Sequence, residues 1–253
     1  HRVMKAQWTL FLLAVQFLTR LPVPADLPFS EELQARAARY FPAAGLVVGG
    51  LGAAVLALGA QLWALPVAVL LSLAATLIAT GALHEDGLAD AADGLVGGAD
   101  RDRALEIMRD SRIGSYGVLA LGVALAIKVA VLAALPIGVA CAALIGGHVL
   151  GRASAVQVIA LDRYARAEGA KFAPPRVARH DRLVAAGTTV FILIALLPWL
   201  GAGLAAALVG AALLGSVFRR LFLRKLGGYT GDCLGAMQQL VELGFYLGLA
   251  AWA

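Results

Sequence analysis

Long apolar stretches recur along the whole chain and constrain its fold more than any other feature. Hydrophobic residues make up 61% of the sequence and charged residues 15%, whereas a soluble domain is roughly 45–50% apolar. A helix of about 20 apolar residues crosses a bilayer, and it bonds its backbone polar groups internally, as lipid requires. The sequence therefore predicts an all-α, polytopic integral membrane helical bundle that forms one domain over residues 1–253. We expect about seven transmembrane helices. They are predicted at residues 43–62, 67–83, 118–135, 138–159, 184–200, 203–218 and 235–252.

A shorter apolar segment, residues 8–18, precedes the first predicted span and lies between Lys5 and Arg20. It is too short to cross a bilayer, so we expect an N-terminal interfacial or re-entrant helix. Pro22 and Pro24 follow the segment, and proline prevents a helix from continuing. The segment lacks the small-residue cleavage pattern of a signal peptide, so we expect it to stay in the mature protein.

The connections between the predicted spans are of two kinds, and their alternation predicts the topology. Short, nearly uncharged connections lie at residues 63–66, 136–137 and 201–202, and long, charged connections lie at residues 20–42, 84–117, 160–183 and 219–234. If the short connections share one side of the membrane, all the long ones lie on the other side. The positive-inside rule places that side in the cytoplasm. We therefore expect a protein of the bacterial cytoplasmic (inner) membrane whose active site faces the cytoplasm.

The net charge of +5 is explained by the same rule, so we expect anionic ligands and membrane lipids as partners, and no nucleic acid. One long connection is especially basic. Its side chains either contact anionic lipid head groups or dock an anionic substrate, and the sequence leaves both alternatives open. They are Arg163, Arg166, Lys171, Arg176, Arg179 and Arg182.

Three aspartates, Asp86, Asp90 and Asp93, recur at positions i, i+4 and i+7. On a helix this spacing places the three carboxylates on one face. Clustered carboxylates repel one another and need a compensating cation; Mg²⁺ fits because it prefers oxygen ligands and binds substrate phosphates at the same time. The alternative is a solvated acidic helix end, but such faces usually carry lysine or arginine, and residues 84–100 contain neither. The sequence therefore predicts a magnesium site here.

Two further motifs contain candidate phosphate-binding residues. Arg109, Ser111 and Arg112 stand before a Gly-Ser-Tyr-Gly turn, and an arginine fork matches phosphate oxygens; contacts to lipid head groups are the alternative. A second turn contains Gly228 and Thr230 before the last span, where a helix N-terminus offers free N–H groups to phosphate.

Asp232 follows this second turn directly. It is interpreted either as the N-cap of the last helix or as a further ligand of the metal ion. The sequence leaves both roles open.

Three ionisable residues, Lys128, His148 and Arg152, fall inside predicted spans. Because a charge in lipid is costly, such residues are candidates for function. Arg152 either lines a polar substrate cavity or extends to the interface, and His148 is interpreted as a packing residue with a hydrogen bond. Lys128 lies deeper and is a candidate for substrate binding.

These motifs, in this order, resemble the cobalamin-5′-phosphate synthase family, also called adenosylcobinamide-GDP ribazoletransferases. The resemblance covers nearly the whole chain, and one local departure is Glu85, where the family has an apolar residue. We therefore assign no role to Glu85. The segments that carry the resemblance are residues 17–24, 84–94, 103–117, 163–166 and 227–236.

The resemblance implies a Mg²⁺-dependent enzyme of the cytoplasmic membrane. It implies transfer of adenosylcobinamide phosphate from adenosylcobinamide-GDP onto α-ribazole or α-ribazole 5′-phosphate, with release of GMP. In this reaction Asp232 is expected to join the three aspartates at the metal, and Arg109 and Arg112 are expected to stabilise the charge on GMP. His84 is the candidate base, with an aspartate as an equal alternative. Lys128 and Arg152 are expected towards the floor of the corrinoid cavity, and a homo-oligomer is left open.

Two rival functions are less consistent with the sequence. A CDP-alcohol phosphotransferase of the phospholipid type requires an Ala-Arg pair after its Asp-Gly, but Ala89 is followed by Asp90. A cation transporter places its ion site near the membrane midplane, often within internal repeats. The aspartates of this chain instead stand at the end of a predicted span, and no repeat is evident.

Overall fold

The computed structural model describes residues 2–166 and 176–252, and the described chain is built of helices. Lys171 of the basic connection lies outside the described residues. The helices are α1 (Arg2–Leu18), α2 (Glu31–Ala37), the short 3₁₀ helix η1 (Ala38–Tyr40), α3 (Phe41–Gly59), α4 (Leu65–Thr80), α5 (Leu83–Gly97), α6 (Arg101–Ile107), α7 (Ser115–Ala134), α8 (Ile137–Leu161), α9 (Arg179–Ala195), α10 (Leu197–Leu200), α11 (Gly203–Leu226) and α12 (Gly231–Trp252).

The prediction of a helical membrane protein is confirmed, and the predicted spans fall on helices. The predicted span 184–200 covers parts of two helices, α9 and α10, which are separated at Leu196. Within the described residues, four helical segments are long and apolar enough to cross a membrane, and a fifth is added if α4 and α5 form one bent span. Helix α9 has only 17 residues, and α12 has Gln238, Gln239 and Glu242 near its middle. The count of seven spans therefore stays a prediction.

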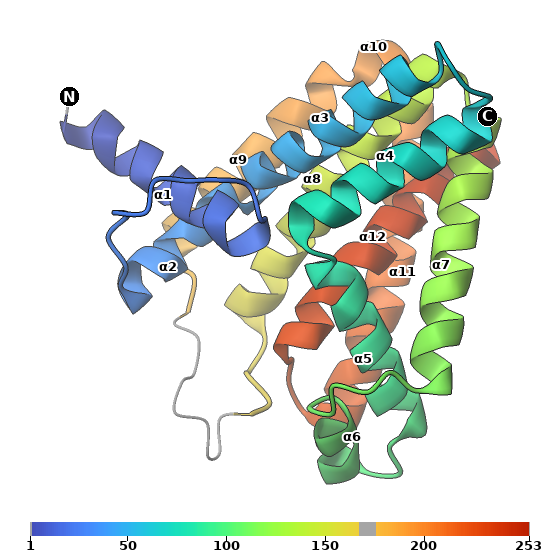
Figure 1. Cartoon of the computed structure of the whole chain (residues 1–253). Coiled ribbons are helices and arrows are strands. Elements are labelled where there is room, and N and C mark those ends of the chain that lie inside the picture. The colour runs from blue at the N-terminus through green and yellow to red at the C-terminus, as the bar shows by residue number, and fades with distance from the viewer. Residues whose placement is uncertain (1, 167–175, 253) are drawn as a thin grey trace.

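Helix α12 lies in the middle of the bundle, with α7, α8 and α11 around it (Figure 1). Its buried residues include Phe245 and Tyr246, both fully buried, and the polar Gln238, Gln239 and Glu242. A helix that is enclosed on all sides does not need an apolar face towards lipid. This position explains why α12 tolerates polar residues in an otherwise apolar sequence.

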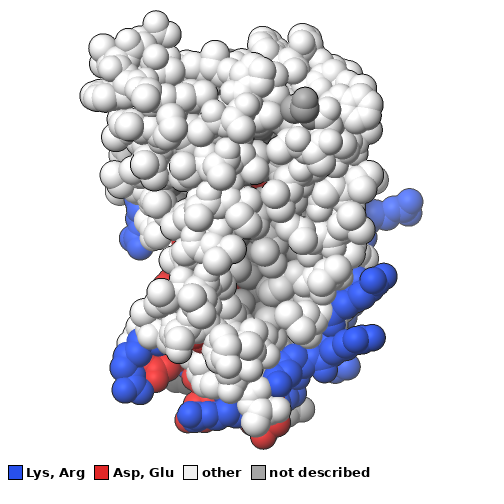
Figure 2. Space-filling view, turned by 90° about the vertical axis from the view of Figure 1, so that its right-hand side faces the viewer, with Lys and Arg blue, Asp and Glu red and all other residues white. Residues whose placement is uncertain are grey.

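The short connections all lie at one end of the bundle, at the top of Figure 1, while α5, α6 and the turn before α12 lie at the opposite end. Figure 2 shows a similar division of charge on one face of the molecule. Lysines, arginines and acidic residues gather towards the lower end, and the surface near the upper end has none. The two kinds of connection therefore separate as predicted, which gives the bundle one polar end.

A sharp bend between α4 and α5 positions the acidic helix. The two helix axes differ by 89°, and both connecting residues have positive φ angles, 62° for Gly81 and 55° for Ala82. Glycine adopts this conformation readily, whereas alanine adopts it at a cost. The backbone N–H of Arg20 donates to the carbonyl of Ala79 at 2.7 Å, so the segment after α1 is fixed to this bend. Helix α5 consequently leaves the direction of α4, and we treat it as lying outside the spanning segments.

Helix α1 forms a small core with η1 and the start of α3. Leu10, Leu13 and Ala14 are buried there with Phe41, and Gln7 accepts a hydrogen bond from the Tyr40 hydroxyl at 2.9 Å. The predicted N-terminal helix is thus present as a packed element, and its last turn reaches the polar end of the bundle beside α5.

Candidate active site

Helix α5, which contains Asp86 and Asp90, packs against α12, which contains Asp232 in its first turn. Glycines make this approach possible. A Cβ atom on Gly87 would lie 2.9 Å from the Asp232 carbonyl oxygen and 3.1 Å from the Gly235 Cα, so a larger residue would push the two helices apart. The close packing of α5 on α12 therefore brings acids distant in sequence to one site.

Asp90 shows the electrostatic consequence of this packing. Burial, followed by the neighbouring carboxylates of Asp86, Asp232 and Asp93, raises the pKa of Asp90 to about 6, and Arg166 opposes this effect. The described residues contain no group of three or more histidine, cysteine, aspartate or glutamate side chains that lie close enough together to hold a metal ion. Carboxylates that repel each other across a packed interface nevertheless match the oxygen-donor chemistry that Mg²⁺ requires.

Asp93, the third aspartate of the predicted face, makes contacts of a different kind. Its two carboxylate oxygens accept hydrogen bonds from the backbone N–H groups of Gly114 and Gly117, at 2.7 and 2.8 Å. Its side chain is buried, and α7 has no side-chain cap of its own at Gly114. Asp93 therefore caps the N-terminus of α7, where a negative charge is favourable.

Contacts in the turn before α12 distinguish between the two roles considered for Asp232. The Cys233 N–H donates to the Thr230 hydroxyl at 3.3 Å, so Thr230 is the capping residue and the N-cap interpretation of Asp232 is wrong. The Asp232 carboxylate instead accepts from Arg166 at 3.2 Å. Thr230 is fully buried, and Gly228 packs against the backbone of Arg163. Gly228 and Thr230 were both predicted to bind substrate, but their described contacts stabilise the turn before α12.

A cavity of about 220 Å³ lies between α1, α3, α5, α8 and α12, with acidic residues in its lining. Asp86 and Asp232 contribute carboxylates, while His84, Arg152 and Gln238 contribute other polar groups. A polar cleft of about 470 Å³ adjoins it at Asp86. The structure thus brings the candidate base His84, which is buried, and the intramembrane Arg152 to the same cavity as the acids.

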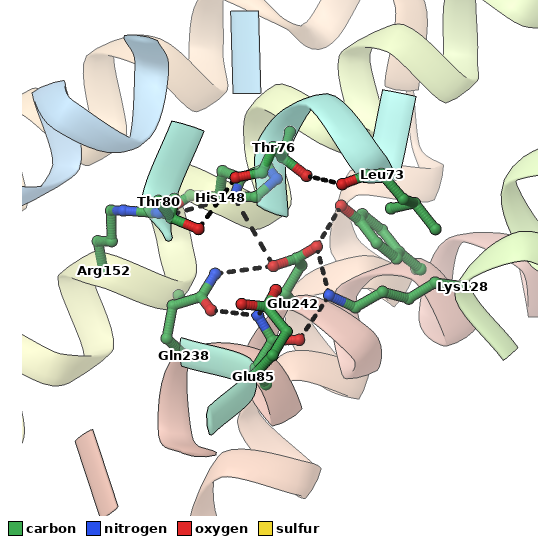
Figure 3. A network of polar contacts seen from close by, with 12 residues as sticks. Leu73, Thr76, Thr80, Glu85, Lys128, His148, Arg152, Gln238 and Glu242 are labelled. Carbon is green, nitrogen blue, oxygen red and sulfur yellow. Dashed lines mark hydrogen bonds and ion pairs between the residues drawn. The ribbon is translucent and has the colours of Figure 1, made fainter. Parts of the chain in front are cut away.

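A buried polar network centred on Glu242 adjoins this cavity through Arg152 and Gln238 (Figure 3). Lys128 donates from Nζ to Gln239 Oε1 at 2.8 Å and to Glu242 Oε1 at 2.9 Å. Glu242 also accepts from Gln238 at 2.7 Å and from the Tyr246 hydroxyl at 2.8 Å. Lys128, predicted to bind substrate, is therefore an ion-pair partner that joins α7 to α12.

The network also includes residues of α5 and α8 (Figure 3). Gln239 donates to Glu85 at 3.0 Å, which connects the acidic helix to the core. Arg152 Nη1 lies 3.0 Å from His148 Nδ1 and donates to the His148 carbonyl at 3.1 Å. Arg152 is 1% exposed, so its guanidinium does not extend to the interface. His148 is a hydrogen-bonded packing residue, as predicted.

A further cavity of about 270 Å³ is lined by three arginines, Arg101, Arg109 and Arg166, and by two acidic residues, Asp102 and Glu106. Arg166 also contacts Asp232, so this cavity adjoins the acid cluster. Arg112 does not share the site, because it is exposed and paired with Asp110 at 2.7 Å. Ser111, its neighbour, is likewise exposed.

Sequence reasoning missed Arg166 as the partner of Asp232, and it missed the pairing of Lys128 with Glu242. Arg166 stood among many basic residues without any distinguishing spacing. Lys128 and Glu242, in contrast, are opposite charges in two predicted spans, and charges in lipid usually pair with one another. That signal favours an ion pair between the two residues.

The fold and the site together define a helical integral membrane protein with an acid cluster at one polar end, flanked by two cavities. Comparison with known proteins identifies the family within this class. A family model described as cobalamin-5-phosphate synthase matches residues 10–250. The chain belongs to the cobalamin-5-phosphate synthase family, and the resemblance seen in the sequence is confirmed.

Curated relatives match over nearly their whole length, and each is named adenosylcobinamide-GDP ribazoletransferase. The protein of Leptothrix cholodnii is 47% identical, with 96% of this chain and 95% of the relative covered. That of Ralstonia pickettii is 44% identical, with 98% of both chains covered, and that of Vibrio cholerae is 38% identical, with 99% and 96% covered. No solved structure matches the chain.

Proposed function

We propose that this protein is an adenosylcobinamide-GDP ribazoletransferase. The observation that carries the proposal is the match of nearly the whole chain to relatives of that name, together with a cavity lined by Asp86 of α5 and Asp232 of α12. The enzyme transfers adenosylcobinamide phosphate from adenosylcobinamide-GDP to α-ribazole or α-ribazole 5′-phosphate. The products are adenosylcobalamin, or its 5′-phosphate, and GMP.

We propose that Asp86, Asp90 and Asp232 would hold a Mg²⁺ ion with carboxylates from two helices, and that the ion would draw them together, because the described residues form no preformed group of three such ligands. Burial, together with repulsion from the neighbouring carboxylates, raises the pKa of Asp90, and a bound cation would remove that repulsion. Asp93 supports the site by fixing the start of α7 beside α5. When bound, the ion supplies charge neutralisation for the diphosphate of the activated substrate.

In the proposed reaction the ribazole 3′-hydroxyl oxygen forms a bond to the phosphorus that carries the cobinamide, and the bond from that phosphorus to the GMP oxygen breaks. The hydroxyl proton moves to a carboxylate of the cluster or to His84, which shares the cavity with Asp86.

The arginine-lined cavity on the far side of Asp232 suits the leaving nucleotide. Arg109 and Arg166 line it, and guanidinium groups stabilise the charge that develops on a departing phosphate. Arg112 faces away from this cavity in its pair with Asp110, so Arg109 is the member of the predicted arginine pair that we assign to GMP.

We place the protein in the bacterial cytoplasmic (inner) membrane with its polar end towards the cytoplasm. The lysines and arginines gather at that end (Figure 2), as the positive-inside rule requires of a cytoplasmic face. Contacts of the exposed arginines with anionic lipid head groups fit the same orientation.

Replacing one carboxylate tests the proposal. The Asp86→Asn variant, purified and reconstituted in lipid, is expected to lose turnover of adenosylcobinamide-GDP with α-ribazole 5′-phosphate, because an amide is a much weaker magnesium ligand. Asp26→Asn serves as the matched control, since Asp26 is exposed in the segment after α1. Near-normal activity of a folded Asp86→Asn protein would contradict the metal assignment.

A further inference from the structure

The guanidinium group of Arg152 is buried without a full set of hydrogen-bond acceptors. Its Nη1 atom contacts His148, but within the described chain its Nε and Nη2 atoms have no partner, although the residue is only 1% exposed. The carboxylate of Glu242 is already engaged by Lys128, Gln238 and Tyr246. A buried cation with unused N–H groups is costly, which indicates that its acceptor lies beyond the described residues.

The cavity lined by Arg152 has an apolar wall and a polar wall. Phe17, Leu18, Phe41 and Leu83 supply apolar surface, and the rings of Phe17 and Phe41 are stacked at 5.8 Å with an angle of 11° between their planes. Such a wall suits a flat aromatic group.

The cavity volume is about 220 Å³, which is below the roughly 300–1,000 Å³ typical of pockets for drug-sized ligands. It therefore suits one part of a substrate, such as a base with its sugar. The corrin ring with its side chains is much larger than this space.

The charges around the cavity define what that part must contain. Asp86 and Asp232 contribute carboxyl groups to the lining, and Arg152 is the one arginine or lysine among the described residues that line it. A ligand with a hydroxyl group at the acids and an anionic group at the arginine is complementary to this arrangement.

We propose that this cavity holds the ribazole substrate and that Arg152 binds its 5′-phosphate. This inference rests on the proposed function. The benzimidazole base lies against the apolar wall, and the ribose 3′-hydroxyl remains beside Asp86 and Asp232. Arg152 is thereby the residue that distinguishes α-ribazole 5′-phosphate from unphosphorylated α-ribazole.

Steady-state kinetics with the two ribazole substrates test this inference at saturating adenosylcobinamide-GDP. In Arg152→Gln the KM for α-ribazole 5′-phosphate is expected to rise about tenfold or more, as for loss of a charged hydrogen bond. The KM for α-ribazole is expected to change less than about twofold, because that substrate offers no phosphate to the arginine. Arg152→Lys retains the positive charge but not the planar guanidinium group. Its KM for the phosphorylated substrate is therefore expected to lie between the values of wild type and Arg152→Gln. Arg36→Gln, on the exposed surface of α2, is the control.

The outcomes separate the inference from the proposed function. Equal increases in both KM values, or a fall in kcat alone, would show that Arg152 has only a structural role. If Arg152→Gln does not fold, wild type and Arg152→Lys decide the question, because equal KM values of wild type for the two substrates overturn this distinction. If folded wild type converts neither substrate, the proposed function itself is wrong.

Discussion

A single methyl group at Gly87 is expected to disturb the active site more than the fold. In Gly87→Ala the added Cβ would lie 2.9 Å from the Asp232 carbonyl oxygen and 3.1 Å from the Gly235 Cα. Carbon atoms in ordinary contact are about 3.5–4.0 Å apart, so α5 and α12 must separate by about 0.5–1 Å. Such a shift moves Asp86 and Asp90 relative to Asp232.

The two effects of this change differ in size. Overpacking costs about 1–3 kcal/mol, but alanine in a helix interior regains about 1 kcal/mol over glycine, so the net loss of stability is about 0–2 kcal/mol. Misplacing catalytic groups by about 1 Å can cost about 100-fold in rate. We therefore expect kcat of Gly87→Ala to fall about 10- to 100-fold, with a modest change in the unfolding midpoint.

The assay measures GMP release by lipid-reconstituted protein at increasing Mg²⁺ concentrations, alongside thermal unfolding in detergent. Gly122→Ala on α7 is the control, because a Cβ at Gly122 meets nothing within 4 Å, and it is expected to keep wild-type activity. Activity of Gly87→Ala within twofold of the Gly122→Ala control would refute the reasoning that close packing of α5 on α12 assembles the site.

Three other predictions concern single contacts. Lys128→Met leaves Glu242 buried without its cation, so the free energy of unfolding in detergent should fall by about 3–5 kcal/mol; the added Glu242→Gln change should restore part of it, and no restoration would argue against the ion pair. Asp93→Asn removes the charge at the start of α7 and one acceptor oxygen, which should cost about 1–2 kcal/mol and speed hydrogen exchange at Gly117; unchanged exchange would contradict the capping role. Asp90 has a pKa raised from 3.8 to about 6, so the metal-free folded state loses stability as pH rises between these values. Mg²⁺ should accordingly raise the unfolding midpoint more at pH 7.5 than at pH 5, and equal stabilisation at both pH values would contradict this assignment.

The helices of this protein were predictable because lipid leaves little choice. Stretches such as residues 138–159 are apolar over a full span, and α8 occupies Ile137–Leu161 as that pattern requires. The bend between α4 and α5 had no such signal. Gly81 is an ordinary candidate for a positive φ angle, but Ala82 beside it also has one, and nothing in the sequence indicates that an alanine will adopt it.

The candidate site was predictable only in part, because helical spacing gives a shared face without telling what packs on it. Asp86, Asp90 and Asp93 recur as one stripe, yet the start of α7 covers Asp93 and takes both of its oxygens. Asp232 reaches the stripe through the close packing of α12 on α5, which is a tertiary contact. Lys128 was recognised as unusual from its place in a span, whereas its contacts became clear only from the structure.

The most direct test of the central claim is to incubate purified, lipid-reconstituted protein with adenosylcobinamide-GDP and α-ribazole 5′-phosphate, with Mg²⁺ or with EDTA. The products are followed by chromatography. The account predicts that GMP and adenosylcobalamin 5′-phosphate form together in equal amounts with Mg²⁺, and that neither forms with EDTA. Absence of both products from correctly folded protein with Mg²⁺ would contradict the proposed function, and equal product formation with EDTA would contradict the metal site.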